Sequence, residues 1–127
     1  MQNQVLPINY NVKEQLLSIK YKDAIRIARC TQTVGQQLDN LFESRYVIEY
    51  GTSPIRKKLG MISELVEAIA SHKNLLPKTI KKILESSESE FVRNNTFVNL
   101  YRNPGVNKNL KAEVKQKAEE LIILLVK

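Results

Sequence analysis

A chain of 127 residues, 43% hydrophobic and 26% charged, is long enough for one hydrophobic core and has the composition of an ordinary globular protein. The single cysteine, Cys30, excludes an internal disulfide, and the longest apolar run, LIILLV at 121–126, is too short to span a bilayer. The sequence MQNQVLPINY shows no basic region followed by an apolar stretch, so we expect no signal peptide. We predict a cytoplasmic protein with one helical domain over residues 1–127, in which residues 1–10 are an extended lead-in.

The net charge of +7 is concentrated in the middle of the chain. Residues 51–84 contain seven lysine or arginine residues and two acidic ones, a surplus of five, whereas the segments on either side have a surplus of one each. A local basic excess is typical of a surface that binds a polyanion. Solubility is the plainer explanation of the same charge.

The first predicted helix follows the lead-in. Pro7 disfavours helix at the residue before it, whereas Asn11 and Glu14 have the spacing of a capping box. Beyond the box, apolar residues keep helical spacing at Val12, Leu16 and Ile19. We therefore expect a helix that begins at Asn11 and passes through Ile19.

A longer helix is predicted from about Ala24 to Arg45. Its apolar residues form one stripe, made of Ile27, Val34, Leu38, Leu41 and Phe42. Gly35 within it costs about 1 kcal/mol relative to alanine, which indicates close packing or a slight bend. The following YVIEYG, at 46–51, is either a short strand or the frayed end of this helix, and the lack of an obvious partner strand favours the frayed end.

The clearest helix runs from Pro54 to about Ser71. Its apolar residues recur at alternating spacings of four and three, at Ile55, Leu59, Ile62, Val66 and Ile69. Pro77 begins the next helix, because proline suits the first helical position.

Two further helices complete the chain. Ser87 and Glu90 form a second capping-box pattern and predict a helix that passes through Val98 and ends near Tyr101. NPGVNKN, at 103–109, is turn sequence. The last helix has its apolar residues at Leu110, Val114, Ala118, Leu121 and Leu125.

Five or six helices joined by short loops, without convincing alternating strands, predict an all-α fold, a compact bundle. PIRKKLG at 54–60 and PKTIKKIL at 77–84 both place a lysine pair after a proline that starts a helix. The spacing differs by one residue, so we interpret the pair as similar usage rather than a true repeat.

No catalytic constellation is evident, and we expect neither an enzyme nor a cofactor. His72 is the only histidine, which excludes a site with two imidazole ligands, and it lies where it would cap the end of a helix. Cys30 is interpreted as a small buried apolar residue. The carboxylates of Glu85, Glu88 and Glu90 are better explained by a helix start than by a metal site.

The cations form three groups that are candidates for binding nucleic-acid phosphates. The first shares one helix face, which continues as Thr33, Gln36, Gln37 and Asn40. The second and third lie in the first turns of two helices. In order, the groups are Lys22, Arg26 and Arg29; Arg56, Lys57 and Lys58; and Lys78, Lys81 and Lys82.

The second group raises a question, because the start of a helix already carries partial positive charge and three more cations there are mildly unfavourable. Ser53 and Pro54 indicate a helix start directly before the group. A bound phosphate would meet free N–H groups, the helix dipole and the cations together. Side chains that simply extend into water are the alternative.

The stretch TSPIRKKL, residues 52–59, resembles the T-S-x-I-R-K-x-L helix start of some small subunits of type III CRISPR effector complexes. The resemblance covers some eight residues, and the proline inside the motif departs from the family pattern. It implies a small helical subunit that stacks along a guide RNA–target duplex and holds nucleic-acid backbone without cutting it. The helical carboxy-terminal domain of a type I large subunit, made as a separate protein, is a second family that the chain resembles.

We therefore predict a non-catalytic small subunit of a CRISPR effector-like ribonucleoprotein, which binds the backbone of the guide RNA–target duplex or the displaced strand. Its expected partners are nucleic acid, other protein subunits and possible further copies of itself, but no membrane. The alternatives are a helical protein-interaction adaptor, whose basic face meets an acidic protein, and a small DNA-binding regulator.

Overall fold

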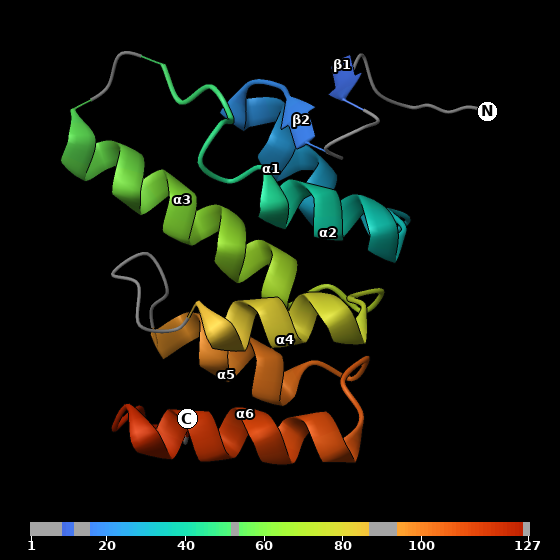
Figure 1. Ribbon diagram of the computed structural model, residues 1–127, viewed down its shortest axis with the longest axis vertical. Coiled ribbons are helices and arrows are strands. Elements are labelled where there is room, and N and C mark those ends of the chain that lie inside the picture. The colour runs from blue at the N-terminus through green and yellow to red at the C-terminus, as the bar shows by residue number, and fades with distance from the viewer. Residues whose placement is uncertain (1–8, 12–15, 52–53, 87–93, 126–127) are drawn as a thin grey trace.

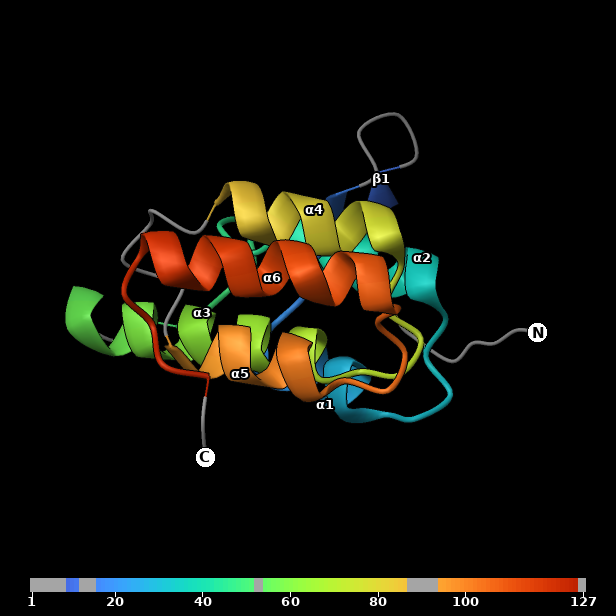
Figure 2. The ribbon, with the colours of Figure 1, turned by 90° about the horizontal axis from the view of Figure 1, so that it is seen from below.

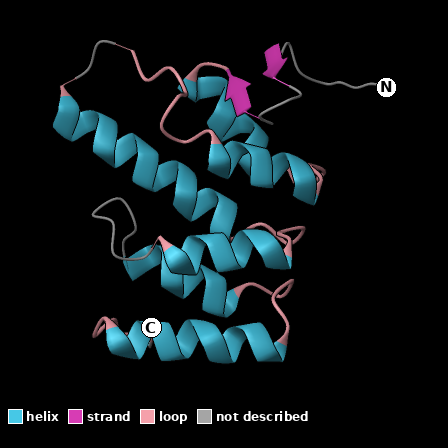
Figure 3. Ribbon diagram, in the orientation of Figure 1, coloured by secondary structure: helices cyan, strands magenta, loops and turns pink. Residues whose placement is uncertain are grey.

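The structure, a computed structural model, describes residues 9–11, 16–51, 54–86 and 94–125, and over these residues it is an all-α bundle of six helices, as predicted (Figures 1 and 3). A short antiparallel pair of strands precedes the helices and pairs Asn9 with Ser18. In chain order the elements are β1 (Asn9–Asn11), β2 (Leu16–Ser18), α1 (Tyr21–Arg29), α2 (Gly35–Glu43), α3 (Ile55–Ala70), α4 (Pro77–Glu85), α5 (Asn94–Arg102) and α6 (Lys108–Glu120).

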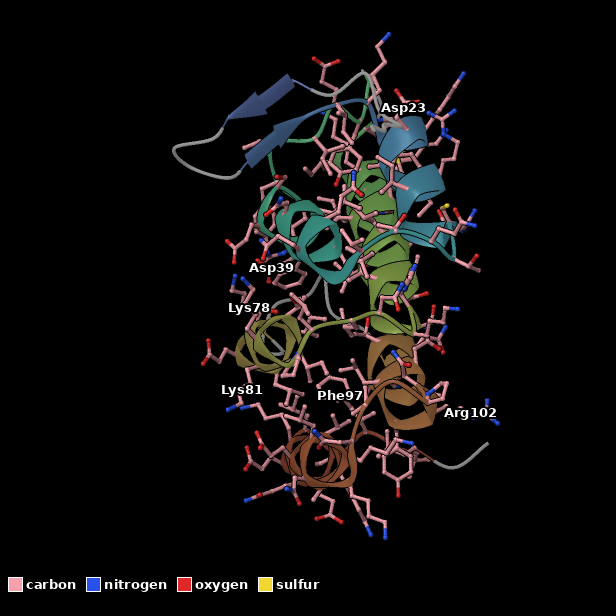
Figure 4. The ribbon with its side chains drawn as sticks, turned by 90° about the vertical axis from the view of Figure 1, so that its right-hand side faces the viewer. Asp23, Asp39, Lys78, Lys81, Phe97 and Arg102 are labelled. Atoms are coloured by element: carbon pink, nitrogen blue, oxygen red, sulfur yellow. The ribbon has the colours of Figure 1, made fainter. Side chains whose placement is uncertain are left out.

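The helices alternate between two layers (Figures 2 and 4). Helices α1, α3 and α5 form one layer, in which α3 packs between the other two, and α2, α4 and α6 form the other layer, with α4 in the middle. Helices α2, α4 and α6 run parallel to one another and antiparallel to α3 and α5 (Figure 1). Consecutive helices therefore make three hairpins stacked along the long axis of the molecule, an arrangement typical of α-solenoids.

The hydrophobic core lies between the two layers. Phe97 on α5 points into it from one side, as Figure 4 shows, and is fully buried. Each such side chain contributes about 1.5–3 kcal/mol when it leaves water. The largest fully buried side chains come from five helices and are Phe42, Phe97, Leu38, Leu41, Leu65, Ile69, Ile80, Ile83, Leu100, Val66 and Val114.

The helix predicted to begin at Asn11 is wrong, because Leu16–Ser18 is a strand. Residues 19 and 20, before α1, also run extended, since Glu49 donates its N–H to Ile19 O and accepts from the N–H of Tyr21, at 2.9 and 2.8 Å. These pairings with β1 and with residue 49 satisfy the backbone without a helix. A three-residue apolar pattern is too short to outweigh them.

The single helix predicted from Ala24 to Arg45 is also wrong, because the chain breaks at residues 30–34 and reverses into the other layer. Thr33 is buried there, and its hydroxyl donates to the carbonyl oxygen of Ile27 at 2.7 Å. This local hydrogen bond competes with a continuing helix. Val34, assigned to the core stripe, is instead 60% exposed.

Gly35 is the first residue of α2. Of the two explanations given for a glycine here, close packing and a slight bend, the structure confirms close packing. A Cβ at this position would lie 2.6 Å from both the Leu76 side chain and the carbonyl oxygen of Asn74. Residues 44–47 continue α2 as turns, with Val47 and Ile48 donating to Ser44 O, so the frayed helix end predicted for 46–51 is confirmed only at the start of that segment. Glu49 instead forms a parallel bridge with Lys20, a pairing that was not evident from the sequence.

The starts predicted for α3 and α4 are confirmed. Pro54 is the residue before α3, and Pro77 is the first residue of α4. The capping box of Ser87 and Glu90 lies outside the described residues. Helix α6 ends at Glu120, earlier than predicted, and Ile122 beyond it has a positive φ of 58°.

Candidate functional site

The first predicted cation group, on α1, is largely engaged in ion pairs. Arg26 contacts Asp23 at 3.1 Å and Arg29 contacts Glu64 of α3 at 3.3 Å, whereas Lys22 is exposed without a partner among the described residues. The polar continuation predicted for this face is wrong. Because the helix breaks after Arg29, two of its four members, Thr33 and Asn40, are buried in the fold.

The third predicted group, on α4, mainly joins α4 to α2. Lys82 contacts Asp39 at 2.9 Å and Glu43 at 2.7 Å, and Lys78 donates to Gln36 Oε1 at 2.9 Å. Lys81 is exposed and faces away from the other layer (Figure 4).

Burial of Lys82 acts to lower the pKa of its ammonium group, but the hydrogen bonds to Glu43 and Asp39 and the charges of both carboxylates outweigh it and raise the pKa. The start of α4 also offers little to an anion. Pro77 has no N–H, and Thr79 already donates its N–H to Leu76 O at 3.0 Å. Lys82 is therefore a structural residue of the α2–α4 contact.

The second predicted group, at the start of α3, stands free. Arg56 and Lys57 are exposed and Lys58 is half-buried, and no described residue forms an ion pair or hydrogen bond with any of the three side chains. Pro54 provides no side-chain cap, and the first intrahelical bond runs from Lys58 N to Pro54 O at 3.0 Å. The earlier N–H groups of the helix therefore lack a partner within the helix.

The fold does not bring the three groups together. The start of α3 lies at one edge of the bundle and the start of α4 at the opposite edge (Figure 1). Helices α1 and α4 belong to opposite layers (Figure 4). The nine predicted residues therefore do not form one continuous basic surface.

Beside the free cations lies an open apolar groove that is not evident from the sequence. It runs between residues 46–51 and the first half of α3 and has a volume of about 560 Å³. We call it the Tyr46–Ile62 groove, and its apolar walls are formed by Tyr46, Ile48, Tyr50, Ile55, Leu59 and Ile62.

The groove keeps large apolar side chains in water. Ile55 is 70% exposed and Tyr46 is 51% exposed. Val47, next to Tyr46 in the sequence, is 53% exposed. Contiguous exposed apolar surface on a folded protein marks an interaction site more often than single exposed residues do.

The wall opposite α3 is held in place by aromatic and polar contacts. The Tyr50 hydroxyl donates to Arg45 O at 2.6 Å, and the Tyr50 ring lies 5.5 Å from that of Tyr21. The guanidinium of Arg45 sits between two rings, 4.0 Å from the centre of Phe42 and 4.4 Å from that of Tyr46. Tyr46 therefore lines the groove with its ring against the Arg45 guanidinium.

The tyrosines behind this wall are kept neutral. Burial raises the pKa of the Tyr50 hydroxyl, partly offset by the charge of Arg45. Burial also raises the pKa of Tyr21, and a hydrogen bond from its hydroxyl to Glu64 together with the charge of that carboxylate adds to the rise.

The cations near the groove flank its apolar helix face. Lys58 and Glu49 line the groove with opposite charges. Arg56 lies on the other side of the Ile55–Leu59 face from Lys58, whereas Lys57 lies on the opposite face of α3. The positive end of the α3 dipole adds to these charges. Signals for the groove were present in the sequence, since YVIEYG and the Ile55–Leu59 pair are both apolar, but only the tertiary fold brings them face to face.

The structure gives no support for a catalytic role of His72 or Cys30 within the described residues. His72 is buried, with Nε2 2.7 Å from Cys30 O and Nδ1 accepting from the N–H of Asn74 at 3.0 Å, so both ring nitrogens are used. Cys30 is exposed, so the prediction of a buried cysteine is wrong, because the helix ends at Arg29. Among the described residues, no three His, Cys, Asp or Glu side chains are grouped so as to hold a metal ion.

Comparison of the chain with protein-family models, with curated proteins and with solved structures found no match. Within the described residues, none of the helices has the length and apolar character needed to cross a bilayer.

Proposed function

We propose that this protein is a non-catalytic helical adaptor of the cytoplasm that binds an acidic partner protein at the Tyr46–Ile62 groove. One observation carries the proposal: two exposed apolar side chains, Ile55 and Tyr46, line the groove together with Lys58, and Lys58 and its neighbours Arg56 and Lys57 have no partner among the described residues.

The apolar half of this surface favours a protein over a nucleic-acid backbone. Phosphate and sugar are contacted by cations, by polar side chains and by backbone N–H groups. Ile55 and Leu59 offer none of these, whereas an apolar side chain of a protein would remove them from water at about 25 cal/mol per Å² buried. The stacked hairpins also support this function, because such stacks present extended surfaces to their partners.

The test is site-specific photo-crosslinking in the cell of origin, with a photoreactive amino acid in place of Tyr46, which lines the groove. We expect a protein adduct that protease removes and nuclease does not. The adduct should disappear when Ile55→Asp is added, because a charge then occupies the groove. A photoreactive amino acid at Ala112, exposed on α6, is the matched control and should give no such adduct.

A second candidate is the small subunit of a CRISPR effector-like ribonucleoprotein, which would hold nucleic-acid backbone. The cations at the start of α3, which have no partner among the described residues, and the N–H groups that lack a partner within the helix favour it, because a phosphate there would interact with both kinds of group. In that case the adduct is sensitive to nuclease.

The salt dependence of nucleic-acid binding separates the two candidates further. If the second candidate holds, replacing Arg56, Lys57 and Lys58 by glutamine makes the slope of log K against log salt shallower by roughly 0.7 to 0.9 for each phosphate that is no longer neutralised. If the adaptor function holds, the slope is the same for this variant and for Lys108→Gln/Lys111→Gln/Lys115→Gln, which removes equal charge from α6.

A further inference from the structure

The occupant of the Tyr46–Ile62 groove can be characterised from the α3 side of the groove. Ile55, Leu59 and Ile62 follow at spacings of four and three residues, so they lie along one face of the helix. Ile62 is buried, while Ile55 and Leu59 continue the same face outward. An apolar helix face that continues beyond its own core is the surface on which a second helix packs.

The charge of the groove excludes some occupants. A second copy of this chain, related by twofold symmetry, would add its own Arg56 and Lys58 to an interface that already contains these two cations, and like charges oppose such a contact. A basic or neutral segment would leave Arg56 and Lys58 without a partner. Charge complementarity therefore favours an occupant that carries carboxylates beside its apolar face.

The size of the groove fits side chains rather than a folded surface. Its volume of about 560 Å³ is that of a pocket for a few large side chains. Tyr46, held over the Arg45 guanidinium, and Ile55 stand on opposite walls. One or two large apolar side chains inserted between these walls would cover both.

We infer that the groove binds an acidic amphipathic helix of a partner protein. The apolar face of this helix packs on Ile55 and Leu59 and inserts a side chain toward Tyr46, and its carboxylates face Arg56 and Lys58, which flank that face of α3. The inference rests on the proposed function and names the chemistry of the partner at that same site.

The experiment measures binding of three labelled synthetic helical peptides to the full chain by fluorescence anisotropy. The first carries leucine at positions i, i+4 and i+7 with glutamate on the other faces. The second has lysine in place of glutamate, and the third has alanine in place of leucine. We expect the first peptide to bind at least about tenfold more tightly than either of the others, because only the first offers both apolar contact and opposite charge.

Variants locate the binding. Ile55→Asp and, independently, Tyr46→Asp should weaken binding of the first peptide by about tenfold or more. Both positions are exposed, and circular dichroism of each variant should match that of the unchanged protein. Arg56→Gln/Lys57→Gln/Lys58→Gln should weaken binding and flatten its salt dependence, whereas Lys108→Gln/Lys111→Gln/Lys115→Gln should leave the affinity unchanged.

The outcomes separate this inference from the proposed function. Equal binding of the acidic and basic peptides, or no binding of any peptide, overturns the amphipathic helix. If the photo-crosslinked protein adduct nevertheless disappears in Ile55→Asp, the adaptor function stands and its partner has another form. If the adduct is sensitive to nuclease, the adaptor function itself fails, and the inference fails with it.

Discussion

The imidazole Nε2 of His72 donates to the carbonyl oxygen of Cys30 at 2.7 Å, across 42 residues of sequence. The direction of this bond follows from Nδ1, which accepts from the N–H of Asn74 and therefore carries no proton. Asn103 makes the equivalent contact one hairpin later, since its Nδ2 donates to Ala70 O and His72 O at 2.9 and 2.8 Å. The α1–α2, α3–α4 and α5–α6 turns, which join the two layers, are thus hydrogen-bonded one to the next.

Replacing His72 by alanine should lower the free energy of unfolding by about 1–3 kcal/mol, because Cys30 O and the N–H of Asn74 lose their partner. Urea denaturation followed by circular dichroism measures the change. Lys73→Ala, at the neighbouring exposed position, is the control and should stay within about 0.5 kcal/mol of the unchanged protein. Equal effects of the two substitutions would contradict the role assigned to the ring.

Asp39→Ala should destabilise the α2–α4 contact by about 2 kcal/mol. The carboxylate is 5% exposed and accepts from the buried Thr79 hydroxyl at 2.6 Å as well as from Lys82, so its removal leaves a buried hydroxyl without a partner. Glu43→Gln removes only the outer member of the cluster and should cost less than about 1 kcal/mol, because that pair is open to solvent. Thermal unfolding of both variants checks the difference in size.

Stability should fall as the pH rises above about 10. Burial raises the pKa of the hydroxyls of Tyr21 and Tyr50 above their ordinary value of 10.0, so the folded state favours the neutral form. Ionisation of the unfolded chain then pulls the equilibrium toward unfolding. The raised pKa of Lys82 acts in the same direction, because its charged form stabilises the fold below 10.5 and is lost at higher pH.

Unfolding free energies measured from neutral pH to about pH 11 test this alkaline loss. Tyr21→Phe/Tyr50→Phe should show a smaller decline than the unchanged protein, since the two hydroxyls no longer titrate. A decline of equal steepness in both proteins would assign the loss to other groups.

Arg56→Gln/Lys57→Gln/Lys58→Gln should leave the melting temperature unchanged or raise it. Three cations near the positive end of α3 are mildly unfavourable, at about 0.3–1 kcal/mol each at low ionic strength. None of them has a partner to lose among the described residues. Differential scanning calorimetry at low and high salt measures the effect, which should shrink in salt. A clear fall in the melting temperature would reveal a structural role for one of the three.

Much of the helical architecture could be predicted from the sequence, because it depends on local signals. Pro54 and Pro77 identify the starts of α3 and α4, and the spacing from Ile55 to Ile69 identifies the longest helix. The break at residues 30–34 could not be predicted from periodicity, since Val34 continues the apolar spacing while pointing into solvent. The break depends on a tertiary contact, in which α2 begins against Asn74 and Leu76.

The candidate site was only partly predictable, for the same reason. The position of Arg56, Lys57 and Lys58 at the start of α3 could be predicted from the sequence, and no acidic residue lies within the first turn of that helix to pair with them. The engagement of Arg29 by Glu64 and of Lys82 by Asp39 joins residues 35 and 43 positions apart, which sequence spacing does not indicate. The groove itself requires residues 46–51 and α3 to face each other, which is a property of the fold.

The Tyr46–Ile62 groove lies at a joint of the stack. One wall belongs to the segment that leaves the first hairpin, and the other belongs to α3 of the middle hairpin. In stacked hairpins each unit gains much of its stability from its neighbour, so the terminal units open first. An occupant that contacts both walls would hold the first hairpin against the middle one. It would therefore suppress opening of the first hairpin without contacting most of the residues of that hairpin.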